Sequence, residues 1–153
     1  MAIKKLIIIK DTRESDRDIY TYSGPEWADK VLLIRKVLMC GDFSVLGGED
    51  SIIIERKTIA DLCGSFTHDR ERFEREWQRA LDIPHKFLLI EGKMRKIIDG
   101  DYRSGVHPHS LLASIMSWSV RYKYNWFTVD NAGQGEECVF WLLKNYLRIT
   151  EEK

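Results

Sequence analysis

Residues 41–61, GDFSVLGGEDSIIIERKTIAD, contain the pattern that decides the fold. Two runs with strand character, 42–46 and 51–57, flank a Gly-Gly pair that is typical of a tight hairpin turn. Three successive isoleucines in the second run predict a strand buried in the core. If the two strands pair through that turn, the carboxylates of Asp42 and Glu55 come near each other across the sheet.

Carboxylates also end a second predicted strand. Side chains alternate along a strand, so Glu55 and Lys57 share one face while Arg56 points to the other. An earlier apolar run, KLIIIK, predicts a buried strand that ends at Asp11, with Glu14 three residues later. Clustered acids repel one another unless a cation lies between them, and magnesium prefers oxygen ligands. The pattern therefore predicts a divalent-metal site.

The chemistry expected of such a site is hydrolysis of a phosphodiester bond without a covalent intermediate. A divalent cation can activate water and neutralise charge on a phosphoryl group under attack. Lys57 would then hold the attacking water or stabilise the developing negative charge. Plainer interpretations stay open: Asp42 as a turn residue, Glu55 and Lys57 as a structural ion pair, and Arg13 with Glu14 as a solvated loop.

The whole chain is expected to be one α/β domain in which helices flank a mixed central sheet. Gly24 and Pro25 are predicted to open a helix, because apolar residues recur at helical spacing as far as Leu38, before a capping Gly41. Further strands are predicted over 86–91 and from 125, and further helices over 58–66, 69–81, 109–123 and 135–148, with a short helix and loop after Gly92.

Composition narrows the class of protein. The 153 residues, 44% of them apolar, fit a single domain with its own core, residues 1–153. Twenty-four basic residues balance 24 acidic ones, which excludes a protein that binds by net positive charge alone. Three scattered cysteines, the charged N-terminus and the lack of a membrane-length apolar run predict an intracellular protein without a disulfide framework or membrane contact.

Together these residues resemble the GDX(n)ERKX(3)D signature of XPF-type structure-specific endonucleases. Gly41 and Asp42, then ERK at 55–57, then Asp61 stand in that order, and DTRE at 11–14 resembles the DxRE segment of the family. DLCGSF, an Arg-Phe pair and FLLIEG resemble its later blocks. The resemblance covers about residues 6–92.

The resemblance implies a restriction-endonuclease-like core and DNA cleavage that depends on Mg²⁺ or Mn²⁺. It implies metal ligation by Asp42 and Glu55, with Asp11, Glu14 and the main-chain carbonyl of Arg56 beside them. It also implies a catalytic role for Lys57, a supporting role for Asp61, and DNA contacts from Arg13, Arg56 and Arg72. Branched or junction DNA in repair or recombination, and a homodimer, are the partners implied.

Two departures from the family are visible. The tail shows no tandem helix-hairpin-helix repeat, and Glu76 stands where the family often has glutamine. Two rival functions stay open. One is a scaffolding subunit without catalysis, although such subunits typically lose the ERK acids; the other is a nuclease that acts on RNA or on single strands.

Several other features have plain interpretations. Asp61 can complete a capping box with Thr58 as well as serve the site. The charged helix over 69–81 is expected to be mostly a salt-bridged solvent face.

His107 and His109 lack the cysteines or nearby histidines of a zinc site. The Gly-Gly turn lacks the GK[ST] of a nucleotide loop, so no nucleotide cofactor is expected. The aromatic cluster formed by Trp118, Tyr122, Tyr124, Trp126 and Phe127 is expected in the core or at a dimer interface. A basic loop over 93–103 is as readily explained by solubility as by phosphate contact.

Overall fold

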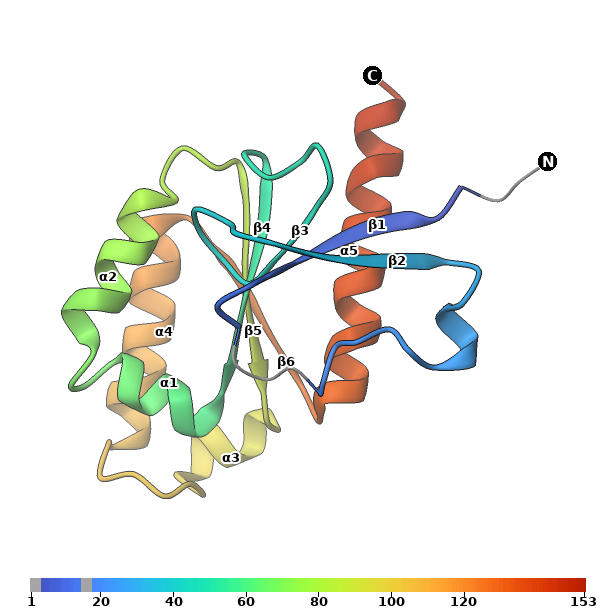
Figure 1. The fold of residues 1–153 in the computed structure, drawn as a ribbon. Coiled ribbons are helices and arrows are strands. Elements are labelled where there is room, and N and C mark those ends of the chain that lie inside the picture. Colours follow the sequence, from blue (N-terminus) through green and yellow to red (C-terminus); the bar gives the residue numbers. More distant parts are fainter. Residues whose placement is uncertain (1–3, 15–17) are drawn as a thin grey trace.

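A six-stranded sheet forms the centre of the computed structural model, which describes residues 4–14 and 18–153. Its strand order is β2-β1-β3-β4-β5-β6 (Figure 1). The strands are β1 Leu6–Asp11, β2 Val31–Lys36, β3 Phe43–Val45, β4 Ile52–Thr58, β5 His85–Glu91 and β6 Asn125–Val129. The helices are the 3₁₀ turn η1 Pro25–Trp27, α1 Ile59–Ser65, α2 Arg70–Arg79, α3 Met94–Asp99, α4 Pro108–Tyr122 and α5 Ala132–Glu151.

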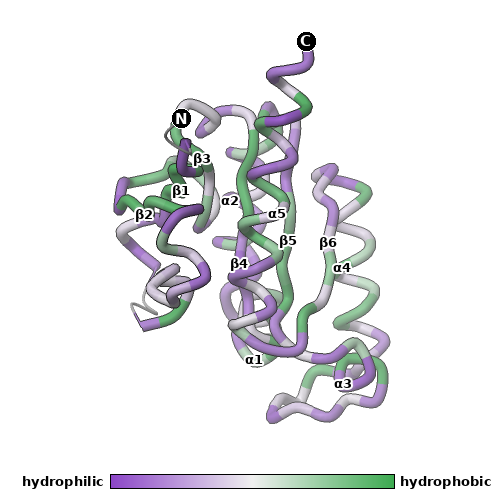
Figure 2. Tube along the Cα trace, turned by 90° about the vertical axis from the view of Figure 1, so that its right-hand side faces the viewer, coloured by the Kyte–Doolittle hydropathy of each residue, from purple (hydrophilic) through white to green (hydrophobic). Residues whose placement is uncertain are grey.

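The sheet is mixed, as predicted, because β3 runs antiparallel to both of its neighbours while the other pairs are parallel. Helix α5 covers one face, and α1, α2 and α4 cover the other (Figure 1). Alternation along β5 serves both layers: Leu89 packs with the α5 cluster, whereas Leu88 and Ile90 pack with the opposite one. Figure 2 shows the apolar residues concentrated in the strands. Among the described residues, no helix is long and apolar enough to cross a membrane.

The segment after Gly24 corrects the predicted helix. Its first residues form only the 3₁₀ turn η1, and Val31–Lys36 form β2, which pairs in parallel with β1 from Leu6 onward. A short apolar run such as VLLI fits a helix or a strand equally well by spacing. The hydrogen-bonding edge of β1 decides the outcome, because an extended segment can satisfy its backbone groups there.

The predicted hairpin is confirmed. Phe43 of β3 stands opposite Ile54 of β4, and the turn between the strands contains Gly47, whose φ of 86° is the left-handed conformation that suits glycine. The amide of Gly48 donates to the carbonyl of Val45 at 2.8 Å. This hairpin carries four of the expected site residues at its open ends, Asp42 just before β3 and Glu55, Arg56 and Lys57 on β4.

Candidate active site

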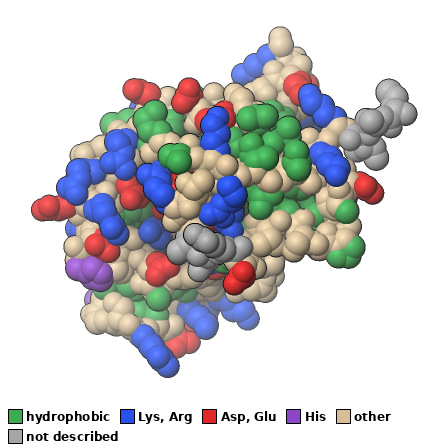
Figure 3. All heavy atoms as spheres, in the orientation of Figure 1, with side chains coloured by type: hydrophobic (Ala, Val, Ile, Leu, Met, Phe, Trp, Pro, Cys, Tyr) green, Lys and Arg blue, Asp and Glu red, His purple; other side chains and the backbone are tan. Residues whose placement is uncertain are grey.

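A cavity of about 470 Å³ opens where β1 and β4 end and β3 begins, beside α2. Its lining combines both charge signs and contains all of the site residues expected from the sequence. Figure 3 shows Lys and Arg side chains gathered over the α2 side of this face, whereas hydrophobic side chains gather over the β1–β2 side. The lining residues are Asp11, Arg13, Glu14, Met39, Cys40, Gly41, Asp42, Glu55, Arg56, Lys57, Asp61, Arg72, Glu76 and Arg79.

Hairpin pairing brings the two central carboxylates together. The Asp42 amide donates to the Ile54 carbonyl at 2.9 Å, and the Arg56 amide donates back to Asp42 Oδ2 at 2.8 Å. Burial, with the negative charge of Glu14 nearby, raises the pKa of Asp42 to about 7 despite that hydrogen bond. Burial and the neighbouring Asp42 also raise the pKa of Glu55 well above its usual value. Two acids held in this way suit a cation between them.

The donor set fits a metal that keeps part of its shell outside the protein. Within residues 4–14 and 18–153, no three His, Cys, Asp or Glu side chains stand close enough to enclose an ion by themselves. Magnesium is usually bound by one or two carboxylates, with waters and substrate phosphates completing six oxygens. Asp42 and Glu55 therefore fit a magnesium or manganese ion that also binds a phosphate.

Lys57 lies beside these acids, as strand alternation predicts. Its Nζ is 3.8 Å from Glu55 Oε1 and 5.2 Å from the centre of the Phe73 ring on α2. The next residue, Thr58, caps α1 by accepting from the Asp61 amide at 3.1 Å. Asp61 is thus part of the helix start and also lines the cavity, so both roles expected of it are compatible.

Asp11 has a different environment from Asp42. Its buried carboxylate accepts from the Leu38 amide at 2.8 Å and from Arg13 Nε at 3.0 Å. The Arg13 guanidinium also donates to the Leu38 carbonyl, and its hydrogen bond to Asp11 raises the pKa of Arg13. Asp11 is thus held by protein donors and orients an arginine at the cavity that it lines, and the metal ligation expected of it stays a prediction.

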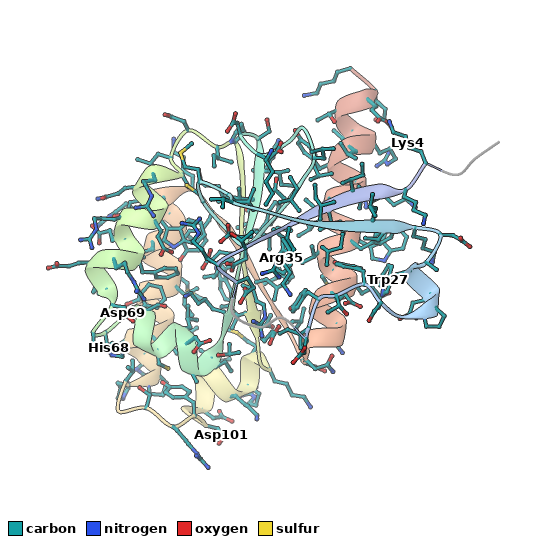
Figure 4. The ribbon with its side chains drawn as sticks, viewed as in Figure 1. Lys4, Trp27, Arg35, His68, Asp69 and Asp101 are labelled. Atoms are coloured by element: carbon teal, nitrogen blue, oxygen red, sulfur yellow. The ribbon has the colours of Figure 1, made fainter. Side chains whose placement is uncertain are left out.

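The segment after Asp11 is also held by β2. Arg35, near the centre of the view in Figure 4, donates to the carbonyls of Thr12 and Glu14 at 3.3 and 3.4 Å. The sequence analysis predicted a helix over the segment that contains Arg35, and it therefore did not predict this contact. Because β2 lies beside β1, its arginine reaches the residues that follow β1.

The Arg56 side chain is paired with acidic residues inside the protein. Its guanidinium is buried and forms a bidentate ion pair with Glu91, with Nε–Oε1 of 2.5 Å and Nη2–Oε2 of 2.9 Å. Its Nη1 lies 3.7 Å from Glu14 Oε1. These acids and the core enclose the guanidinium, although the residue lines the cavity, and the DNA contact expected of it stays a prediction. Its main-chain amide, by contrast, touches Asp42.

Helix α2 supplies one wall of the cavity. Arg72, which is 66% exposed and 3.3 Å from Asp69, lies there as expected, with Glu76 and Arg79 on the same helix face. Figure 4 shows Asp69 beside the start of α2. Among the described residues, none of the glutamates of α2 pairs with an arginine within 4 Å, so the expected salt-bridged face forms only at the helix start, between Asp69 and Arg72. Arg72, Glu76 and Arg79 have the i, i+4, i+7 spacing in the sequence, which is the signal that they share one helix face.

The structure also shows where the two histidines and the aromatic cluster lie. His107 caps α4 by accepting from the His109 amide at 3.2 Å, so His109 lies at the helix start, as expected. Trp118, Tyr122 and Tyr124 are buried beneath α1 and α2. The core interpretation of the aromatic cluster is thus confirmed for these three.

Comparison with solved structures finds proteins of similar fold. XPF from Aeropyrum pernix has a TM-score of 0.70 at 21% identity, over 92% of this chain and 61% of that chain. XPF from Aeropyrum pernix in complex with DNA has a TM-score of 0.70 at 22% identity, over 94% and 66%.

Comparison with curated protein sequences gives no significant match. The chain spans less than two thirds of the length of either XPF chain, and at this identity the likeness confirms the fold, a restriction-endonuclease-like α/β core. The ERCC4 domain model, in addition, matches residues 11–138, most of the chain. The chain therefore belongs to the ERCC4-domain family, the family of XPF-type nucleases.

Proposed function

We propose that this chain is a metal-dependent endonuclease that hydrolyses phosphodiester bonds in DNA inside the cell. The observation that carries the proposal is the pair of half-buried carboxylates, Asp42 and Glu55, held across the β3–β4 hairpin with Lys57 beside them. A divalent cation would supply water activation and neutralise the charge on the phosphate. Asp42 and Glu55 would hold that cation, with the Arg56 carbonyl facing it.

The remaining residues would position and stabilise the substrate. Lys57 would hold the attacking water or stabilise the charge that develops on the phosphate oxygens. The exposed guanidinium groups of Arg13 and Arg72 flank the cavity and would bind the DNA backbone, since guanidinium groups match phosphate geometry. Asp11 would orient Arg13. Asp61 would support the site from the start of α1.

Branched DNA is the substrate class we favour, in repair or recombination. The support comes from membership of the ERCC4-domain family and from the similar fold of the XPF structure that was determined with DNA. A homodimer would place two such sites on one branched molecule, in agreement with what the sequence resemblance implies.

Cleavage of end-labelled DNA tests the proposal. The substrates are linear single and double strands, a flap, a fork and a four-way junction, each with Mg²⁺, Mn²⁺ or EDTA. We expect metal-dependent cleavage that is fastest on a branched substrate and is lost in Glu55→Gln. Glu49→Gln, an identical change in the same hairpin that affects an ion pair with Lys36 instead, is the control that keeps activity.

Two outcomes would contradict the proposal. Binding without cleavage under every metal would identify a scaffolding subunit. Equal cleavage of unbranched single strands and forks would replace structure-specific action by a general single-strand nuclease.

A further inference from the structure

Two tyrosines between β1 and β2 adopt an unusual backbone conformation. Tyr20 has a φ of 53° and Tyr22 a φ of 51°, the left-handed region that bulky residues rarely occupy. Both side chains are buried, at 2% and 6% exposure. Such conformations persist when surrounding contacts enforce them, and they cluster at functional sites. The hydrogen-bond partner of each hydroxyl therefore indicates which contact each backbone conformation makes possible.

The Tyr20 hydroxyl donates to Glu91 Oε1 at 2.5 Å. The same carboxylate, at the end of β5, receives the bidentate hydrogen bonds of Arg56, whose guanidinium carbon lies 5.3 Å from the centre of the Tyr20 ring. The Tyr20 hydroxyl also packs against α5 at Gly135, where a Cβ atom would overlap it. Tyr20 is thus enclosed by the fold and directed at Glu91.

From Arg56 the contacts continue to the candidate active site. The third nitrogen of its guanidinium, Nη1, lies 3.7 Å from Glu14 Oε1, and that ion pair is almost excluded from solvent. Glu14 lies close enough to Asp42 for its charge to influence that carboxyl, and it lines the same cavity. A continuous series of polar contacts therefore joins the left-handed Tyr20 to a residue at the site.

We propose that Tyr20 and Glu91 are positioning residues, which fix the Arg56 guanidinium so that it holds the Glu14 carboxylate beside Asp42. Glu91 sets the orientation of the planar guanidinium through two parallel hydrogen bonds. Tyr20 restrains Glu91 in turn. This inference rests on the proposed function, because it assigns the network to the same metal-dependent site.

Tyr22 provides a matched control. It has the same backbone conformation and lies two residues away, but its hydroxyl donates to the main-chain carbonyl of Glu136 on α5 at 2.6 Å. Tyr22→Phe thus removes a buried hydroxyl from the same segment without touching Glu91. A purely structural role for these tyrosines would give Tyr20→Phe and Tyr22→Phe the same behaviour.

The first experiment compares these two variants with the wild-type chain. We measure kcat and KM for DNA cleavage with Mn²⁺, and Mn²⁺ affinity without DNA by calorimetry. Groups that orient residues at a metal site typically contribute about 10-fold or more, so we expect Tyr20→Phe to lower kcat about 10-fold with KM within about 2-fold, and to weaken Mn²⁺ binding. Tyr22→Phe should stay within about 2-fold of wild type in all three. Equal behaviour of the two variants would overturn the inference.

A double-mutant cycle then tests the route through Glu14. If Tyr20 acts through Glu14, Tyr20→Phe should have no further effect on kcat in a Glu14→Gln background. Multiplicative losses would overturn that route. If the wild-type chain cleaves no DNA, the proposed function fails, and the Mn²⁺ affinities alone decide the network: weaker binding in Tyr20→Phe but not in Tyr22→Phe supports it, and equal affinities reject it.

Discussion

The β3–β4 hairpin and the segment between β1 and β2 both serve the same cavity, yet they reach it by different means. The hairpin places Asp42 and Glu55 through a short turn and main-chain hydrogen bonds between adjacent strands. The other segment is tied down by distant residues, above all Glu136 on α5 and Glu91 on β5. Local pairing therefore builds the centre of the candidate site, whereas long-range contacts hold its surroundings.

The largest effect should come from the hairpin. Asp42→Asn should lower cleavage about 1000-fold, because it removes one anionic ligand from the cation while its amide oxygen can still accept from the Arg56 amide. Cleavage rates and circular dichroism together test this expectation. Asp50→Asn, in the same hairpin loop and exposed to solvent, is the control. If the Asp42→Asn protein cleaves DNA as fast as wild type, Asp42 is not required for catalysis.

The hairpin acids should also make metal binding depend on pH. The pKa of Asp42 is raised to about 7, so protons compete with the cation below that pH, and Mn²⁺ affinity should fall by about 10-fold per pH unit or more. Calorimetric titrations at pH 6 and pH 8 measure this change. A constant affinity across that range would show that neither hairpin acid needs to lose a proton.

Without metal, the same pKa shift predicts the opposite trend for stability. The native state of Asp42 binds its proton more tightly than the unfolded chain does, so this contribution is complete below the unfolded pKa of 3.8 and is lost as pH rises through about 7. Thermal melts in EDTA at pH 5 and pH 8 should show lower stability at pH 8. Added Mn²⁺ should reduce that difference.

The part of this segment that Glu136 holds, around Tyr22 and Trp27, should respond in stability rather than in chemistry. Glu136 accepts from Trp27 Nε1 at 2.9 Å and from the Tyr22 amide at 3.0 Å. Glu136→Ala leaves both buried donors without an acceptor and should lower the free energy of unfolding by about 3 kcal/mol. Urea unfolding measures this loss, with the exposed neighbour in Glu137→Ala as the control. Equal midpoints would mean that Glu136 does not hold the segment.

The smallest effect should distinguish the observed strand from the predicted helix. Val31 is 7% exposed and Leu32 is 49% exposed, because β2 turns only one of them into the core. Val31→Ala should lower the free energy of unfolding by about 2 kcal/mol, and Leu32→Ala by about 0.5 kcal/mol, although leucine loses more atoms. The same urea titrations test both. A larger loss for Leu32→Ala would contradict the observed pairing of β2.

The sequence by itself determined the centre of the candidate site. Alternation along IIIERK placed Glu55 and Lys57 on one face, and the Gly-Gly turn brought Asp42 to them, because strand period and turn chemistry act between near neighbours. Only the tertiary structure decided that VLLI forms β2, that Asp11 is held by protein donors and that Arg56 pairs with Glu91. These outcomes depend on the edge of β1 and on partners up to 35 residues away along the chain, whose proximity no local pattern encodes.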